Sequence, residues 1–192
     1  EIVRYTDTLA MTSANSDKTN HFSLAADLTR TANLNFSTLS LDASANAVTL
    51  DMGGFSLQTD NSTLGRGVVV NGSFPVTVRN GPHGAQSSTF LYNYGSGKLS
   101  WELMNGNCVY VAAGPGLIEF TQPLSNTFHV VEGTTRLTAE QNFTNSVILM
   151  MGNGVLEIGA DLNGGTAGDF TRGLGFSGPN QIGFYAGGGF SA

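Results

Sequence analysis

Few side chains in this sequence could do chemistry, and the first candidates are two glutamates. Glu119 and Glu157 each stand five residues after a glycine of a recurring pattern, so they share a repeat position two repeats apart, about 10 Å from each other in a stacked fold. Paired carboxylates serve as acid and base in polysaccharide lyases and hydrolases. Arg136 stands only three residues after its own glycine and is not expected to share their row. We therefore expect a solvated outer face here, with a catalytic pair as the alternative.

Two further residues have ligand or nucleophile chemistry. His83 lies in an insertion, residues 79–88, which is expected to form a surface loop, and no second His, Cys or carboxylate stands at metal-ligand spacing from it. Cys108 is the single cysteine, so it forms no internal disulfide, and its apolar neighbours favour a buried core residue. The sequence thus predicts no enzymatic activity, no metal ion and no cofactor.

Three aromatic residues, Tyr92, Tyr94 and Trp101, are candidate carbohydrate contacts because exposed rings stack on sugars. The alternation along one strand places Tyr92 and Tyr94 on the same face. An outward face would form a carbohydrate platform, and an inward face would make them core rings. Together with Phe90 they occupy alternating positions that valines fill in the preceding repeat, which favours the core.

A repeat from residue 47 to residue 162 must position these side chains. A short apolar run, a glycine and a second apolar run recur, with glycines at Gly53, Gly72, Gly95, Gly114, Gly133 and Gly152. The intervals are 19, 23, 19, 19 and 19 residues. Helical repeats need more than about 30 residues, and the runs are rich in alternating β-branched and aromatic residues. The pattern predicts an all-β fold, a single-stranded parallel β-helix (β-solenoid) of about six rungs with 19 residues each and glycine corners. Right-handed coiling is expected from the general chirality preference.

The chain divides into three parts on this pattern. Residues 1–46 are expected to form an N-terminal strand, a loop and a cap, with a short helix over residues 24–30 as one form of the cap. Residues 47–162 form the solenoid. Residues 163–192 are a glycine-rich tail or cap without a 19-residue rung.

Composition limits the function classes. Only 11% of the 192 residues are charged, and 26 are glycine, which suits a rigid extracellular β structure. The net charge of −6 argues against nucleic acid as a partner, because phosphate binding needs clustered Lys and Arg. No apolar stretch approaches the roughly 20 residues of a membrane-spanning helix. No signal peptide is visible, so export would require that one has been removed.

The C-terminal tail carries a pattern known from one protein family. The matching residues are Phe170, Thr171, Arg172, Leu174, Gly175, Gly178, Gln181, Ile182, Gly188, Gly189, Phe190 and Ala192. In these positions the chain resembles secreted bacterial proteins with autotransporter-associated β-strand repeats, of the type associated with PEP-CTERM sorting. The resemblance implies a secreted β-solenoid of surface or matrix type without an assigned catalytic activity. Family members usually continue into more repeats, so we expect an excised fragment or a short processed subunit.

The ends of a β-helix are open sheet edges, and they are the candidate subunit interfaces. The residues that we expect there are Ile2, Val3, Tyr5 and Leu9 in the N-terminal strand and Ile182, Phe184 and Phe190 in the tail. Contacts of one end with the other end of a second copy do not close and give filaments. The first hypothesis is therefore an extracellular, self-assembling structural subunit whose partner is itself. A carbohydrate-binding adhesin module and a polysaccharide lyase or hydrolase are the second and third.

Overall fold

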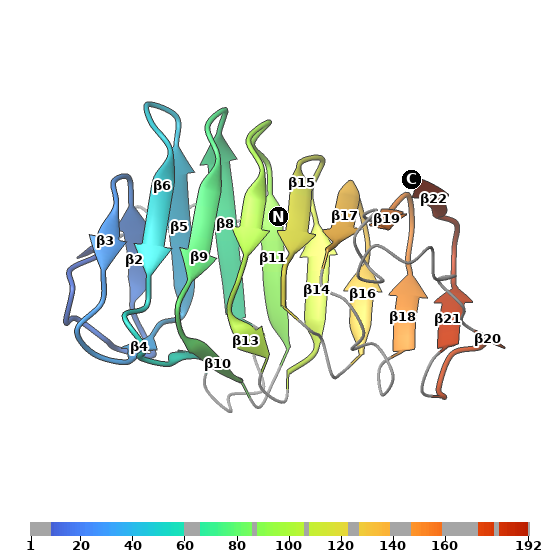
Figure 1. Ribbon diagram of the computed structural model, residues 1–192, viewed down its shortest axis with the longest axis horizontal. Helices are drawn as coiled ribbons and strands as arrows, with labels where there is room; N and C mark the ends of the chain where they lie inside the picture. Colours follow the sequence, from blue (N-terminus) through green and yellow to red (C-terminus); the bar gives the residue numbers. More distant parts are fainter. Residues whose placement is uncertain are drawn as a thin grey trace.

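The computed structural model describes residues 9–59, 66–85, 88–105, 108–122, 127–138, 147–158, 173–178 and 181–191. Every regular element in these ranges is a β-strand, and all paired strands are parallel. Figure 1 shows the strands side by side along the long axis of the molecule, in the order of the rungs. The prediction of an all-β parallel β-helix is confirmed.

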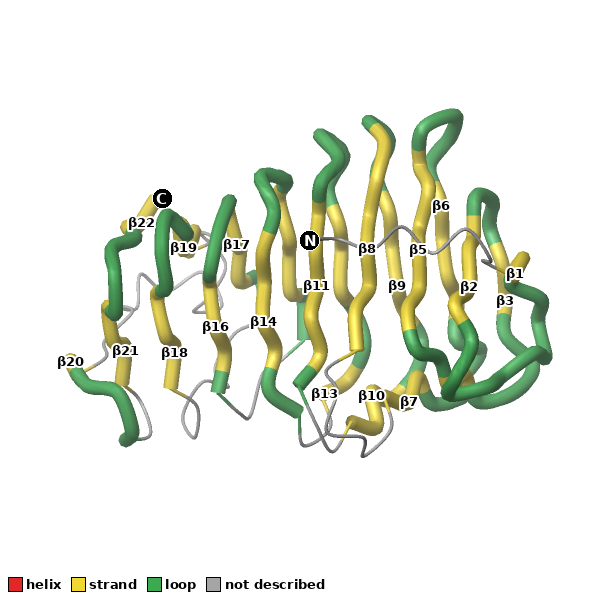
Figure 2. The backbone as a smooth tube through the Cα atoms, turned by 180° about the vertical axis from the view of Figure 1, so that it is seen from behind, coloured by secondary structure: helices red, strands yellow, loops and turns green. Residues whose placement is uncertain are grey.

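Sheet A forms one broad side of the coil, which faces the viewer in Figure 2. In the order of pairing its ten described strands are β1 (Leu9–Ala10), β2 (His21–Leu24), β5 (Thr38–Ala43), β8 (Arg66–Gly72), β11 (Thr89–Asn93), β14 (Tyr110–Ala113), β16 (Phe128–Val130), β18 (Val147–Met150), β21 (Gln181–Phe184) and β20 (Gly173–Leu174).

Sheet B forms the opposite broad side and lies in front in Figure 1. Its eight described strands are β3 (Leu28–Thr29), β6 (Val48–Asp51), β9 (Val76–Arg79), β12 (Leu99–Trp101), β15 (Leu117–Phe120), β17 (Thr134–Leu137), β19 (Val155–Ile158) and β22 (Gly189–Ser191). In Figure 1 the chain runs upward through sheet A, which lies behind, and then crosses to sheet B in front. It runs downward through sheet B and moves one rung to the right. This path is a right-handed coil.

A third, narrow sheet closes the lower side of the first half of the coil (Figure 1). Sheet C contains β4 (Leu34–Asn35), β7 (Leu57–Thr59), β10 (Pro82–Ala85) and β13 (Met104–Asn105). Among the described residues no strand after β13 belongs to it. The rungs that contain β4, β7, β10 and β13 are therefore three-sided.

Rung length varies along the coil and does not follow a fixed period. Successive partners on the inner face of sheet A are Leu39, Val68, Leu91, Ala112 and Val130, which lie 29, 23, 21 and 18 residues apart. The interval of 19 expected from the glycines does occur, between Leu99 and Ile118 in sheet B. Strand pairing keeps the register while the corners absorb insertions and deletions.

Glycines do occupy corners, as predicted. Gly114 and Gly133 follow β14 and β16 with φ of +91° and +70°. A Cβ at Gly133 would lie 2.0 Å from the carbonyl oxygen of Gly114 on the neighbouring rung, so the corners approach too closely for a side chain. Gly53 differs, because it follows β6 at the corner between sheets B and C and lies against the carbonyl of Arg30. The 19-residue interval between Gly53 and Gly72 therefore joins a corner between sheets B and C to a corner between sheets A and B, and it is not the length of a rung.

The core lies between sheets A and B, where the inward positions of each strand are apolar and buried. The burial of alternate residues, as in β5, β8 and β11, explains why these segments form strands. Large rings fill its centre: Trp101, Tyr110, Phe120 and Phe128 contact one another in sequence with centroid distances of 6.2, 5.3 and 5.1 Å.

The sheets continue through both boundaries that we expected at residues 46 and 162. Strands β2 to β5 belong to the same three sheets as the later rungs, and residues 24–30 contain β3 and no helix. In the tail, β21 pairs with β18 and β22 pairs with β19, which makes a further rung. Residues 21–51 contain no glycine, so alternating apolar residues are sufficient for a rung there.

Candidate functional site

The C-terminal end of the coil exposes apolar side chains that face the core side. Leu174, Phe184 and Phe190 are 79%, 36% and 53% exposed, although each pairs with a buried residue of the neighbouring strand. Phe184 from sheet A and Phe190 from sheet B meet edge to face, with ring centroids 5.9 Å apart. Among the described residues β22 pairs only with β19. We call these three residues and β22 the C-terminal end surface.

Ile182, which we expected at a subunit interface, lies elsewhere. Its side chain is 3% exposed, and its strand β21 is enclosed between β18 and β20. Ile182 pairs with Ile148 of the core, so it stabilises the last rung from inside and offers no contact surface.

The N-terminal end also leaves sheet B open. Within the described residues β3 pairs only with β6. Leu9 in β1 is 49% exposed, although it pairs with the buried Phe22. Leu9 and β3 form the N-terminal end surface. Ile2, Val3 and Tyr5, the other candidates for this end, lie outside the described residues.

A buried arginine holds the loop of residues 11–20 over the rest of this end. Arg30 is 1% exposed, and its guanidinium donates to the backbone carbonyls of Thr12, Asn15 and Asn33, at 2.7 Å for Asn15 and 3.2 Å for Asn33. Burial lowers the pKa of this group. Sequence reasoning missed this clamp, because the arginine stands in a polar segment without any pattern.

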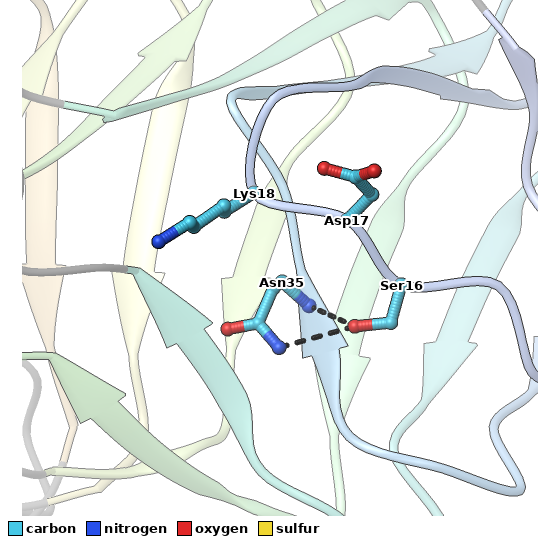
Figure 3. Close-up of a pocket in the computed structure, with 4 residues that line it drawn as sticks. All are labelled: Ser16, Asp17, Lys18 and Asn35. Atoms are coloured by element: carbon cyan, nitrogen blue, oxygen red, sulfur yellow. Dashed lines mark hydrogen bonds between the residues drawn. The ribbon is translucent and has the colours of Figure 1, made fainter.

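Figure 3 shows a shallow depression on this loop, with a volume of about 390 Å³. Ser16, Asp17, Lys18 and Asn35 line it. The Ser16 hydroxyl accepts hydrogen bonds from the backbone N–H and the side-chain amide of Asn35 at 2.7 and 3.1 Å. The Asp17 carboxylate accepts from the backbone N–H and hydroxyl of Thr19. These bonds stabilise the loop, and the side chains do not converge on a common point.

An aromatic row lies on the outer face of sheet A. Tyr92 is half-buried and Tyr94 is 42% exposed. Leu91, which precedes Tyr92, and Asn93, which stands between the two tyrosines, are buried. Phe90, Tyr92 and Tyr94 are nearly parallel, with successive ring centroids 6.1 Å apart and interplanar angles of 6° and 3°. The expectation that these rings belong to the core is wrong. Leu91, not Tyr92, pairs with the inward Val68, so a shift of one residue reverses the faces.

Trp101, the third carbohydrate candidate, is in the core. Its side chain is 1% exposed, and its Nε1–H donates to the hydroxyl of Tyr110 at 3.2 Å. A glycan cannot reach this ring in the folded protein. The outer-face candidates therefore reduce to Tyr92 and Tyr94, joined by Phe90.

The insertion that carries His83 is a strand of sheet C and not a surface loop. His83 is completely buried and faces Tyr110, Cys108 and Thr89. Trp101 donates to the hydroxyl of Tyr110, and this hydroxyl lies 2.7 Å from Nδ1 of His83. Nε2 of the same ring lies 3.4 Å from the Thr89 hydroxyl. Inward-facing polar side chains here form a hydrogen-bonded chain inside the core.

Burial makes this cluster chemically inert. It lowers the pKa of His83 to about 3 and raises the pKa of Cys108 to about 12. The cluster therefore holds a neutral imidazole beside a neutral thiol, whereas a cysteine nucleophile needs a thiolate. The prediction of a buried Cys108 is confirmed, since the side chain is 2% exposed.

Charged side chains form one row across the outer face of sheet B. Glu119, Arg136 and Glu157 are register partners on β15, β17 and β19, and Lys98 binds Glu119 at 2.5 Å. Arg136 lies between the glutamates and pairs with both, at 3.2 and 2.8 Å. Our expectation that it stands outside their row was wrong, because the corner after Gly114 is two residues longer than the corner after Gly133.

This row does not have the arrangement of a catalytic pair. Burial disfavours ionisation of Glu119, but hydrogen bonds from Lys98 and Arg136 outweigh it and lower the pKa of the carboxyl. A general acid needs a raised pKa. The row acts as an ion-pair ladder that joins four rungs.

Among the described residues there is no group of three or more His, Cys, Asp or Glu side chains placed to hold a metal ion. The same residues include no helix long and apolar enough to cross a membrane. Comparison with protein-family models, with curated proteins and with solved structures finds no match.

Proposed function

We propose that this protein is an extracellular structural subunit whose copies stack end to end into a filament or surface layer. The observation that carries the proposal is the C-terminal end surface, where Leu174, Phe184 and Phe190 expose apolar area on the core side of the last rung. Burying such area against a partner is favourable at about 25 cal/mol per Å².

The two ends are complementary in a way that supports stacking of copies. Strands β3 and β22 are the two edges of the same parallel sheet, so β3 of one copy can pair with β22 of the next in the direction of the existing strands. Leu28 and Phe190 both hold inward register positions, opposite the buried Leu50 and Leu156. Joining them would extend sheet B and its inward apolar row from copy to copy. Such a head-to-tail contact repeats without closing, which gives a filament.

The extracellular assignment rests on composition and on resemblance. Charged residues are 11% of the chain, and 26 glycines allow close packing between rungs and between neighbouring molecules. The tail pattern resembles secreted bacterial proteins with autotransporter-associated β-strand repeats, which implies a surface or matrix location. An ordered coil without a catalytic arrangement among its described residues suits a structural role.

Assembly can be tested by negative-stain electron microscopy and light scattering across a range of protein concentrations. We expect fibres or rods whose length increases with concentration. The double variant F184S/F190S should remain as single short rods, because polar side chains remove the apolar contact. F74S is the matched control, since Phe74 is 43% exposed at the corner between β8 and β9, away from both end surfaces, and it should assemble like the wild type. A wild-type chain that stays monomeric at high concentration would overturn the proposal.

A further inference from the structure

The outer face of sheet A combines an aromatic row with a polar strip. Phe90, Tyr92 and Tyr94 project outward along β11 with two equal steps of 6.1 Å. Two strands away, the outward residues of β5 are Thr38, Ser40 and Asp42. The intervening strand β8 presents Gly67, Val69 and Asn71 on the same face. We call this combination the sheet A strip.

The register sets rings and polar groups opposite each other. Phe90 pairs with Gly67, which pairs with Thr38, and Tyr92 pairs with Val69, which pairs with Ser40. Strands are about 4.8 Å apart, so the two rows lie about 10 Å from each other. Gly67 places no side chain between Thr38 and Phe90, and the Tyr92 ring lies close to it, within 4 Å of the position that a Cβ would take.

These groups match the chemistry of a sugar chain. A pyranose ring has an apolar C–H face that packs on an aromatic ring and equatorial hydroxyls that exchange hydrogen bonds with hydroxyl, amide and carboxylate groups. Burial, together with the neighbouring Tyr94, raises the pKa of Tyr92, so its hydroxyl stays protonated and can donate. Equal spacing of the rings along a straight strand suits a ligand made of repeating units.

Charge narrows the class of sugar. The outward residues of β2, β5, β8, β11 and β14 include no Lys or Arg, and Asp42 adds a negative charge. The whole chain carries a net charge of −6. Acidic polysaccharides would be repelled, whereas a neutral glycan carries no charge to oppose.

We infer that the sheet A strip binds a neutral, linear glycan chain, with Phe90, Tyr92 and Tyr94 as the stacking residues and Thr38, Ser40 and Asn71 as hydrogen-bonding partners. This site is independent of the two end surfaces. A filament with such a strip on every copy would hold a polysaccharide at many points, which multiplies a weak single-site affinity.

Isothermal titration with three neutral β-1,4-linked hexasaccharides, of glucose, xylose and mannose, tests the inference. It uses the full chain carrying F184S/F190S, so that assembly does not complicate the measurement. We expect at least one of them to bind and hexagalacturonate to bind more weakly. Tyr92→Ala and Tyr94→Ala should each weaken binding about tenfold, the loss expected for one stacking contact.

The matched control is Phe55→Ala, which removes a ring of similar exposure at another corner and should keep the wild-type affinity. Thermal melting of each variant checks that the fold is intact. The inference fails if none of the three neutral hexasaccharides binds or if Tyr92→Ala binds as the wild type does. It also fails if Tyr92→Ala alone, without sugar, prevents assembly of an otherwise wild-type chain, because the strip would then be a contact between copies.

Discussion

Arg136 and Glu119 are register partners on neighbouring rungs, and their side chains meet with Nη1 3.2 Å from Oε2. The same guanidinium reaches Oε1 of Glu157 on the next rung at 2.8 Å. One cation thus ties two carboxylates that would otherwise repel each other across sheet B. Such a network contributes more than an isolated surface pair.

Replacing Arg136 with Gln should lower the free energy of unfolding by about 1 kcal/mol, because both glutamates lose a partner while Lys98 still holds Glu119. Urea denaturation at low and high salt measures the loss, which should shrink at high salt. Arg79→Gln is the control, since Arg79 is more exposed and pairs only with Asp51 among the ion pairs of the described residues. An equal loss in both variants would contradict a network effect.

The hydroxyl group of Thr135 is expected to destabilise the core. Its side chain is fully buried, and its hydroxyl has no hydrogen-bond partner. Thr135→Val keeps the shape and removes the hydroxyl, so it should raise the free energy of unfolding by about 1 kcal/mol. Thr77→Val, at a half-buried position on the outer face of sheet B, should change stability little. A destabilised Thr135→Val in urea denaturation would show that the hydroxyl does have a partner.

His83 should make the fold sensitive to acid. Its pKa is about 3 in the folded chain and near 6.5 when unfolded, so between these values the unfolded state binds one more proton. Stability is therefore complete above pH 6.5 and falls as the pH decreases toward 3, by up to about 1.4 kcal/mol per pH unit for this group.

Denaturation of the wild type and His83→Gln between pH 4.5 and 7 measures this slope. The variant should be less stable at pH 7 but should lose less stability on acidification. Burial also lowers the pKa of His129, so His129→Gln serves as a comparison and should flatten the slope to a smaller degree. Identical slopes for the wild type and His83→Gln would be incompatible with a buried neutral imidazole.

Cys108 should behave as an inert thiol in the native protein. Burial raises its pKa to about 12, so almost no thiolate exists at pH 8. Ellman's reagent should react with it only after addition of guanidinium chloride, at a rate set by unfolding. Cys108→Ser should leave assembly and glycan binding unchanged. Rapid labelling of the native chain would show that the core around His83 opens easily.

The fold was predictable because its signals are local. Apolar alternation marks the strands, and Gly114 and Gly133 mark corners where neighbouring backbones touch. The direction in which Tyr92 points was not predictable, because it depends on register, and an insertion in the preceding rung moves the register by an unknown number of residues.

The same limit explains the errors at Arg136 and His83. Arg136 shares a row with the glutamates because the corner after Gly114 is two residues longer than the corner after Gly133. The insertion around His83 became a strand because sheet C already offered β7 as a pairing edge, a long-range feature that the local sequence does not contain. Arg30 depends on loop carbonyls far away in the sequence.

Sheet C joins β4, β7, β10 and β13, and this has a mechanical consequence. The backbone hydrogen bonds between rungs run along the long axis of the coil, so a force that pulls its two ends apart loads the rungs in series. Between β4 and β13 this load is shared by the hydrogen bonds of three sheets. These rungs should therefore bear more tension before their strands separate than sheets A and B alone would allow.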